Sequence, residues 1–220
     1  MTKLFHVALM GCVMLAIAGC GASKAKTPQA AAEKLQEAVT SGDRAEFVAC
    51  FAGTDGQKEL LGSVFDMSQA SDGFNTKVVE VFGEEGLAEF NDGMQMGAGR
   101  QDGFASIKDA DLSTLEFTES EDGTTAVGTG SDGETFDLVK TDEGWQIPAP
   151  EMGGGGPMGA QMMEGMTELF QEMTAEGGKE GMTVATLKET FMTRAMEMMM
   201  KRMEESGMGG PGGMGGGYMP

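Results

Sequence analysis

The spacing of apolar side chains changes once along this chain, and the change restricts the folds that the chain can adopt. Up to residue 90, apolar residues recur every three or four positions, as in amphipathic helices, in the stretches 28–41, 43–51, 57–68 and 76–90. Beyond residue 113 they alternate with polar residues, as in half-buried strands, in the runs 113–119, 124–130, 134–140 and 144–147. We therefore predict an α+β fold, with N-terminal helices packed on one face of an antiparallel sheet of about four strands.

Capping and turn residues separate these stretches. Pro28 stands at a helix start, where its missing N–H costs nothing, and Ser41-Gly42 ends that helix. Asp43 begins the next helix, with Glu46 three residues on as in a capping box. Asp-Gly pairs, such as Asp122-Gly123, lie between the alternating runs and are strong hairpin signals. The order predicted is three or four helices, a Gly-rich loop over 94–103, and a four-stranded meander.

The two ends of this region carry a family resemblance. The segment AAEKLQEAVTSGDRAEFVACF (31–51) has a Ser-Gly-Asp break between two helices, and TTAVGTGSDGETFDLVKTDEGWQI (124–147) closes on Gly-Trp-x-Ile. Together they resemble the NTF2-like (SnoaL-like, DUF4878-like) superfamily over residues 28–150. The resemblance implies a curved sheet and a cone-shaped cavity. In family enzymes an Asp-His or similar pair performs acid–base chemistry there, whereas other members bind ligands or serve as scaffolds.

After residue 150 the composition shifts, because 16 of the 22 methionines and 17 of the 36 glycines lie in the last 70 positions. Residues 151–156 read as a Gly linker and 157–206 as a Met-rich helical hairpin, with helices over 157–175 and 183–206. Residues 207–220 have the low-complexity Gly/Met/Pro composition of a disordered tail. The amphipathic stripe of the first helix is predicted to be Met162, Met166, Leu169 and Met173. That of the second is Met192, Met196, Met199 and Met203, beside Val184, Leu187, Phe191 and Met198.

The methionine stripes have two interpretations. Methionine is a flexible apolar residue, so the stripes can pack against each other, against the sheet, or against another copy or a protein partner. Thioethers at helical spacing can also bind Cu(I), a soft ion that prefers sulfur, and Met192, Met196, Met199 and Met203 are the candidate ligands. Packing or partner binding is the leading interpretation, because an amphipathic helix needs its apolar stripe in order to fold.

The N-terminus has the pattern of an export signal. Lys3 is followed by a mostly apolar run to Ala18, shorter than the roughly 20 residues of a membrane span. The run ends in Ile17-Ala18-Gly19-Cys20, which resembles the lipobox of bacterial lipoproteins. That resemblance implies a signal peptide over 1–19, lipid on Cys20 and a tether over 20–27. The alternatives are an ordinary secretory signal cleaved near Ala22, or a retained N-terminal helix.

Lipoprotein processing would place the chain in the bacterial cell envelope. Because Gly21 is not the Asp that retains such proteins at the inner membrane, the resemblance implies the periplasmic face of the outer membrane in a Gram-negative cell. Cleavage removes Cys12 and the single histidine, His6. The mature chain then lacks imidazole, which excludes histidine bases, Ser-His-Asp triads and histidine metal sites.

Charge and composition narrow the partners further. A net charge of −20 and a pI near 4.2 argue against nucleic acid, whose binders carry basic patches. Cys50 is predicted to be a buried apolar filler, and no motif calls for a cofactor. The sequence therefore predicts a non-enzymatic, lipid-anchored binding or scaffold module, with no catalytic residues. The alternative is a SnoaL-like isomerase or dehydratase that uses carboxylates alone.

Overall fold

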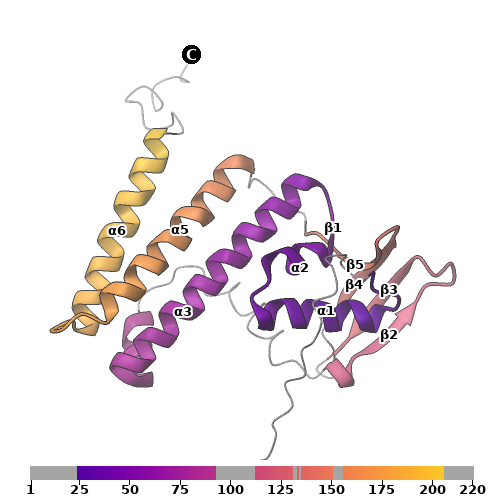
Figure 1. The fold of residues 1–220 in the computed structure, drawn as a ribbon, viewed down its shortest axis with the longest axis horizontal. Helices are drawn as coiled ribbons and strands as arrows, with labels where there is room; N and C mark the ends of the chain where they lie inside the picture. The colour runs from indigo at the N-terminus through magenta and orange to yellow at the C-terminus, as the bar shows by residue number, and fades with distance from the viewer. Residues whose placement is uncertain (1–23, 93–111, 131–132, 134, 151–155, 206–220) are drawn as a thin grey trace, which may run out of the picture.

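The computed structural model describes residues 24–92, 112–130, 133, 135–150 and 156–205. The predicted signal peptide, Cys20, the loop over 94–103, nearly all of the Gly linker and the tail over 207–220 lie outside these residues. Within them the fold is α+β, as predicted: helices followed by a sheet, and then two further helices (Figure 1).

Two short helices begin the fold, and their ends follow the predicted capping residues. Helix α1 (Pro28–Ser41) starts where the Thr27 side chain accepts a hydrogen bond from the Ala30 N–H, and Gly42 ends it with φ of 72°. Helix α2 (Arg44–Ala49) starts at Asp43, whose carboxylate accepts from the Ala45 and Glu46 N–H groups. The Ser-Gly-Asp break is therefore one C-cap followed directly by one N-cap.

Helix α3 (Asp55–Asn91) corrects the prediction of two separate helices over 57–68 and 76–90. Thr54 and Gln57 form a capping box at its start, and the helix continues through 69–75 without a break. It is interrupted instead at Gly83, where φ is 74°. The polar-looking stretch 69–75 stays helical because Phe74 within it is buried in a core with other helices.

The sheet has five strands in the order β1-β5-β4-β3-β2. After the short helix η1 (Leu112–Thr114), the predicted antiparallel meander is formed by β2 (Glu116–Glu119), β3 (Thr125–Thr129), β4 (Thr135–Thr141) and β5 (Gly144–Pro148). The prediction missed β1 (Phe51–Ala52), which pairs in parallel with β5, and it placed Phe51 on a helix. The sheet is therefore mixed.

Three buried clusters hold these elements together. One joins α1 to the sheet through Ala31, Leu138 and Trp145. A second packs Leu35 of α1, Phe47 of α2 and Phe65 of α3 together, with the Phe47 and Phe65 rings stacked at 4.4 Å. The first half of α3 thus belongs to the same body as the sheet.

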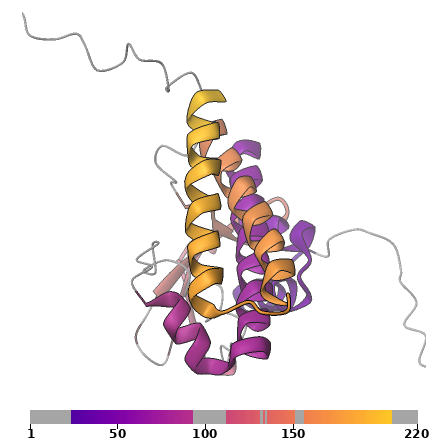
Figure 2. The ribbon, with the colours of Figure 1, turned by 90° about the vertical axis from the view of Figure 1, so that its left-hand side faces the viewer.

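The third cluster lies on the second half of α3 and contains no residue of the sheet. Helices α5 (Gly156–Gly177) and α6 (Val184–Glu205) form the predicted hairpin, which packs against α3 (Figures 1 and 2). The rings of Phe74, Phe90, Phe170 and Phe191 meet at this centre. Among the described residues, none of the helices is long and apolar enough to cross a membrane.

Candidate functional site

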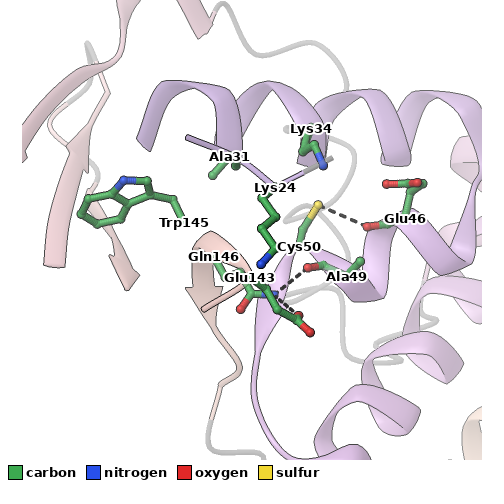
Figure 3. A pocket seen from close by; sticks show the side chains of 10 residues that line it. Lys24, Ala31, Lys34, Glu46, Ala49, Cys50, Glu143, Trp145 and Gln146 are labelled. Carbon is green, nitrogen blue, oxygen red and sulfur yellow. Dashed lines mark hydrogen bonds between the residues drawn. The ribbon is translucent and has the colours of Figure 1, made fainter. Parts of the chain in front are cut away.

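A pocket of about 280 Å³ lies where the N-terminal segment, α1, α2 and β5 meet (Figure 3). It is small beside the 300–1,000 Å³ of most ligand sites, so it suits a ligand of only a few heavy atoms. Its polar lining consists of two lysines, two glutamates, a thiol and an amide, namely Lys24, Lys34, Glu46, Glu143, Cys50 and Gln146. Segments more than 90 residues apart in the sequence supply these groups.

The N-terminal segment forms one wall of the pocket, and it joins the fold earlier than predicted. Ala25 lies beside Gly144 as a parallel bridge, and its carbonyl accepts from the Trp145 N–H at 3.0 Å. Lys24 Nζ donates to the Asp142 carbonyl at 2.6 Å. Ala25 is buried, so the predicted tether is corrected from residue 24 onward, where the chain is already part of the fold.

Gly144 makes this contact possible. Its φ is +103°, and a Cβ there would lie 2.5 Å from the Ala25 carbonyl oxygen. Glycine is the residue that tolerates both conditions. The sequence marked Gly144 only as a turn residue, whereas the structure shows that it also receives the N-terminal segment.

Gln146 is the buried amide of the pocket wall, with an exposed fraction of 4%. Its Nε2 donates to the Ala49 carbonyl at 2.8 Å and to the Phe51 carbonyl at 3.3 Å, and its Oε1 accepts from Thr141 Oγ1 at 2.8 Å. The side chain therefore ties the end of α2 and β1 to the sheet. The sequence analysis missed Gln146, which is the variable residue of Gly-Trp-x-Ile. On a strand that alternates between buried apolar and exposed polar residues, a polar residue between Trp145 and Ile147 is expected to face solvent.

Cys50 is buried, as the sequence predicted, and it lines the pocket together with Gln146. Its Sγ donates to the Glu46 carbonyl at 3.3 Å. Burial raises the pKa of the thiol to about 11; the charge of Lys34 opposes that rise and the charge of Glu46 adds to it. The thiol is thus protonated near neutral pH, and a protonated thiol is a poor nucleophile and metal ligand.

The methionine stripes are placed differently in the two helices of the hairpin. In α5, Leu169 and Met173 are buried, Met166 is partly buried and Met162 is exposed. In α6 the predicted packing face is confirmed for Leu187 and Phe191 and is wrong for the methionines. The residues buried there are Leu187, Phe191 and Ala195.

The predicted α6 stripe instead faces solvent. Met192 and Met196 are 42% and 60% exposed, Met200 beside them is 53% exposed, and Met199 is partly buried. The side chain of Met203 lies outside the described part of the structure. We call Met192, Met196, Met199 and Met200 the α6 methionine face.

Other candidate sites are weaker. In the described part of the chain, no group of three or more His, Cys, Asp or Glu side chains is placed to hold a metal ion. A second hollow, of about 340 Å³, lies along α5 and α6, where Arg194 bridges Glu172 at 3.1 Å and Glu176 at 3.3 Å. No known protein family, no curated protein and no solved structure matches this chain.

Proposed function

We propose that this chain is a lipid-anchored protein of the bacterial cell envelope whose α+β part is a non-enzymatic binding or scaffold module. The observation that carries the proposal is the apolar run ending in Ile17-Ala18-Gly19-Cys20. Lys24 and Ala25, only a few residues after Cys20, are already bonded to the sheet and its β4–β5 turn. Lipid on Cys20 would therefore hold the folded chain close to the membrane, at the outer membrane in a Gram-negative cell.

The order of elements supports an NTF2-like relationship for residues 28–150. Two helices flank the Ser-Gly-Asp break, a long helix follows, and a meander ends in β5 with Gly144-Trp145-Gln146-Ile147. Helices α1 and α2 line the pocket together with β5, which is where the resemblance implies a cavity between helices and sheet. The small volume of this pocket favours a scaffold or a binder of small groups.

The chemistry of the pocket favours a role without catalysis. Glu46 and Glu143 are both exposed, whereas the carboxylates of acid–base enzymes usually lie in a buried cleft. The Cys50 thiol is protonated, and the Gln146 amide is bonded to backbone carbonyls of α2 and β1. The acid–base histidine of NTF2-like enzymes has no counterpart among the lining residues.

The anchor is tested in a bacterial host that lipidates its exported proteins. We expect the chain to incorporate a palmitate analogue, to gain the mass of a diacylglyceryl group and to sediment with membranes. Cys20→Ser should abolish all three. Cys12→Ser is the matched control, because it removes the other cysteine of the N-terminal segment and should change none of them. Labelling that survives Cys20→Ser would refute the proposed anchor.

The α6 methionine face supports a second part of the proposal, namely self-association or binding of a protein partner through residues 157–206. Three of its four side chains are at least 42% exposed on a helix that is already packed through Leu187, Phe191 and Ala195. Clusters of exposed apolar side chains commonly mark interaction surfaces. Flexible methionines are frequent on such surfaces because they adapt to their partners.

Point variants test this surface better than removal of the hairpin, because Phe74 and Phe90 of α3 would lose their cover. We expect Met196→Glu to lower the solution mass or abolish partner capture. Val81→Glu, at another exposed apolar position, is the control and should do neither. An unchanged mass and capture profile in Met196→Glu would contradict this part of the proposal.

The same exposed thioethers favour Cu(I) as the second candidate ligand. The pair Met192→Leu and Met196→Leu separates the two roles, because leucine keeps the apolar surface and removes sulfur. Loss of Cu(I) competition against a chelator, with self-association retained, would assign the face to copper. Retained association without any Cu(I) uptake by the original chain would assign it to a protein partner.

A further inference from the structure

The pocket and the proposed lipid anchor lie close together in the chain. Lys24 is four residues after Cys20, and four Cα–Cα steps of 3.8 Å span at most about 15 Å. Lys24 and Ala25 line the pocket and are fixed to the sheet by hydrogen bonds with Asp142 and Trp145. If Cys20 carries lipid, the wall of the pocket therefore stays within about 15 Å of the residue that enters the membrane. Headgroups are the chemistry found at that level.

The charges of the pocket alternate around a small volume. Figure 3 shows Lys34 and Glu46 on the helical side and Lys24 and Glu143 on the side of the sheet. Lys34 and Glu46 both act on the pKa of the Cys50 thiol, so both charges are felt inside the pocket. Two cations and two anions around about 280 Å³ match a compact zwitterion better than an ion of either sign.

We propose that this pocket binds the phosphate–ammonium group of phosphatidylethanolamine in the membrane to which Cys20 is attached. Lys24 and Lys34 would bind the phosphate as point charges. Glu46 and Glu143 would accept hydrogen bonds from the primary ammonium, which has three donors. The inference rests on the proposed lipid anchor. The net charge of −20 repels anionic lipids but leaves a headgroup of zero net charge unaffected.

The headgroup chemistry is tested first in solution, independently of the anchor. The full chain carrying Cys20→Ser is titrated by calorimetry with phosphoethanolamine, phosphocholine and inorganic phosphate. We expect saturable binding of phosphoethanolamine, and binding at least tenfold weaker for the other two. Phosphocholine lacks the N–H donors that the carboxylates need, and inorganic phosphate lacks the cation. Equal binding of all three, or none, would overturn the proposal.

Variants identify the pocket as the site. Lys34→Gln and Glu143→Gln should each weaken phosphoethanolamine binding at least tenfold, and Lys34→Arg should retain it. Lys26→Gln and Glu37→Gln are matched controls, because both residues are exposed neighbours that do not line the pocket. Circular dichroism confirms that each variant is folded. If Lys34→Gln proves unfolded, Glu143→Gln alone decides. Variants that bind as tightly as the controls would place the ligand elsewhere and refute the proposal.

The lipid source is tested with the lipidated chain, after its mass has confirmed the lipid. The chain is reconstituted in vesicles of phosphatidylcholine with or without phosphatidylethanolamine. Hydrogen exchange of the segments around Lys24 and Gln146 should be slower where phosphatidylethanolamine is present. Identical exchange in the two membranes, together with binding of free phosphoethanolamine, would assign the pocket to a soluble zwitterion and overturn the headgroup assignment. If Cys20 proves to carry no lipid, the anchor proposal is refuted. The titration in solution still tests whether the pocket binds phosphoethanolamine.

Discussion

Cys50 and Gln146 lie together in the wall of the pocket, and backbone carbonyls accept hydrogen bonds from both side chains. The thiol donates to the Glu46 carbonyl, and the amide donates to the carbonyls of Ala49 and Phe51. Buried polar groups that are bonded in this way stabilise a particular arrangement of the backbone, whereas a catalytic group must keep a partner position open for substrate. These two residues therefore build the site, and the lysines and glutamates that line it carry its charge.

The Cys50 thiol makes a pH-dependent contribution to stability. Its pKa is about 11 in the folded chain, and the ordinary value of 9.0 applies to the unfolded chain. Between pH 9 and pH 11 the folded chain therefore keeps the proton that the unfolded chain has lost. The contribution is complete below pH 9 and is lost as the pH rises through 11. We expect the free energy of unfolding to fall by up to about 2–3 kcal/mol more in the original chain than in Cys50→Ala. Urea titrations between pH 8 and 11 measure it, and parallel curves would contradict it.

Gly144 holds the N-terminal segment against the sheet, and Gly144→Ala should release it. The added Cβ would meet the Ala25 carbonyl oxygen at 2.5 Å, in addition to the strain of φ +103°. Gly133→Ala is the control, since its φ is +85° and a Cβ there meets nothing within 4 Å. Each should lose about 1 kcal/mol or more from backbone strain. Only Gly144→Ala should also accelerate hydrogen exchange of the Trp145 amide, and equal exchange in both variants would contradict the contact.

At the scale of elements, α6 shows where sequence periodicity is ambiguous. Leu187, Phe191 and Ala195 recur every four residues, and Met192, Met196 and Met199 recur at +4 and +3, so both sets satisfy a helical period. The sequence prediction put Leu187 and Phe191 into one stripe with the methionines. In the structure the first set is buried, because Phe191 packs against the rings of Phe74, Phe90 and Phe170. Partners far away in the sequence decide which stripe faces the core.

Adjacent residues of α6 provide a direct test of this orientation. Phe191 is 2% exposed and Met192 is 42% exposed. We expect Phe191→Ala to lower the free energy of unfolding by about 3–5 kcal/mol, as for other buried aromatic residues. Met192→Ala should lower it by less than about 1 kcal/mol. Denaturant titrations of the two variants measure this difference, and similar losses would show that α6 is rotated from its position in the structure.

The helix caps, the Asp-Gly turns and the four strands of the meander were predictable, because each depends on residues near one another in the sequence. Strand β1 was not predictable, because two residues carry no period and Phe51 becomes a strand only by pairing with Ile147. The pocket was predicted only in part. The sequence identified Cys50 as buried. Lys24 and Gln146 were missed, because hydrogen bonds between residues at least 95 positions apart in the sequence hold them in the pocket wall. Such contacts leave no local pattern.

At the scale of the whole molecule, α3 joins the core of the hairpin to a core of the α+β part. Leu61 and Phe65 in its first half pack with α1 and α2, and Phe74 and Val78 in its second half pack with α5 and α6 (Figure 1). The sequence suggested a separate hairpin beyond a flexible linker. The structure shows instead that the hairpin covers a helix of the α+β part, so the proposed partner surface and the proposed membrane-proximal pocket are connected through α3.

A shared helix should make the two cores unfold together, because loss of the hairpin core exposes half of α3 and weakens the other half. Leu187→Ala tests this coupling, since Leu187 is fully buried in the hairpin core and its truncation should cost about 2–5 kcal/mol. Trp145, the only tryptophan, lies in the sheet core and reports on the distant part. Its fluorescence and the helical circular dichroism should shift to one common, lower denaturant midpoint. If the fluorescence midpoint stays at its original value while helix is lost earlier, the hairpin and the α+β part unfold independently, and α3 does not transmit stability between the two sites.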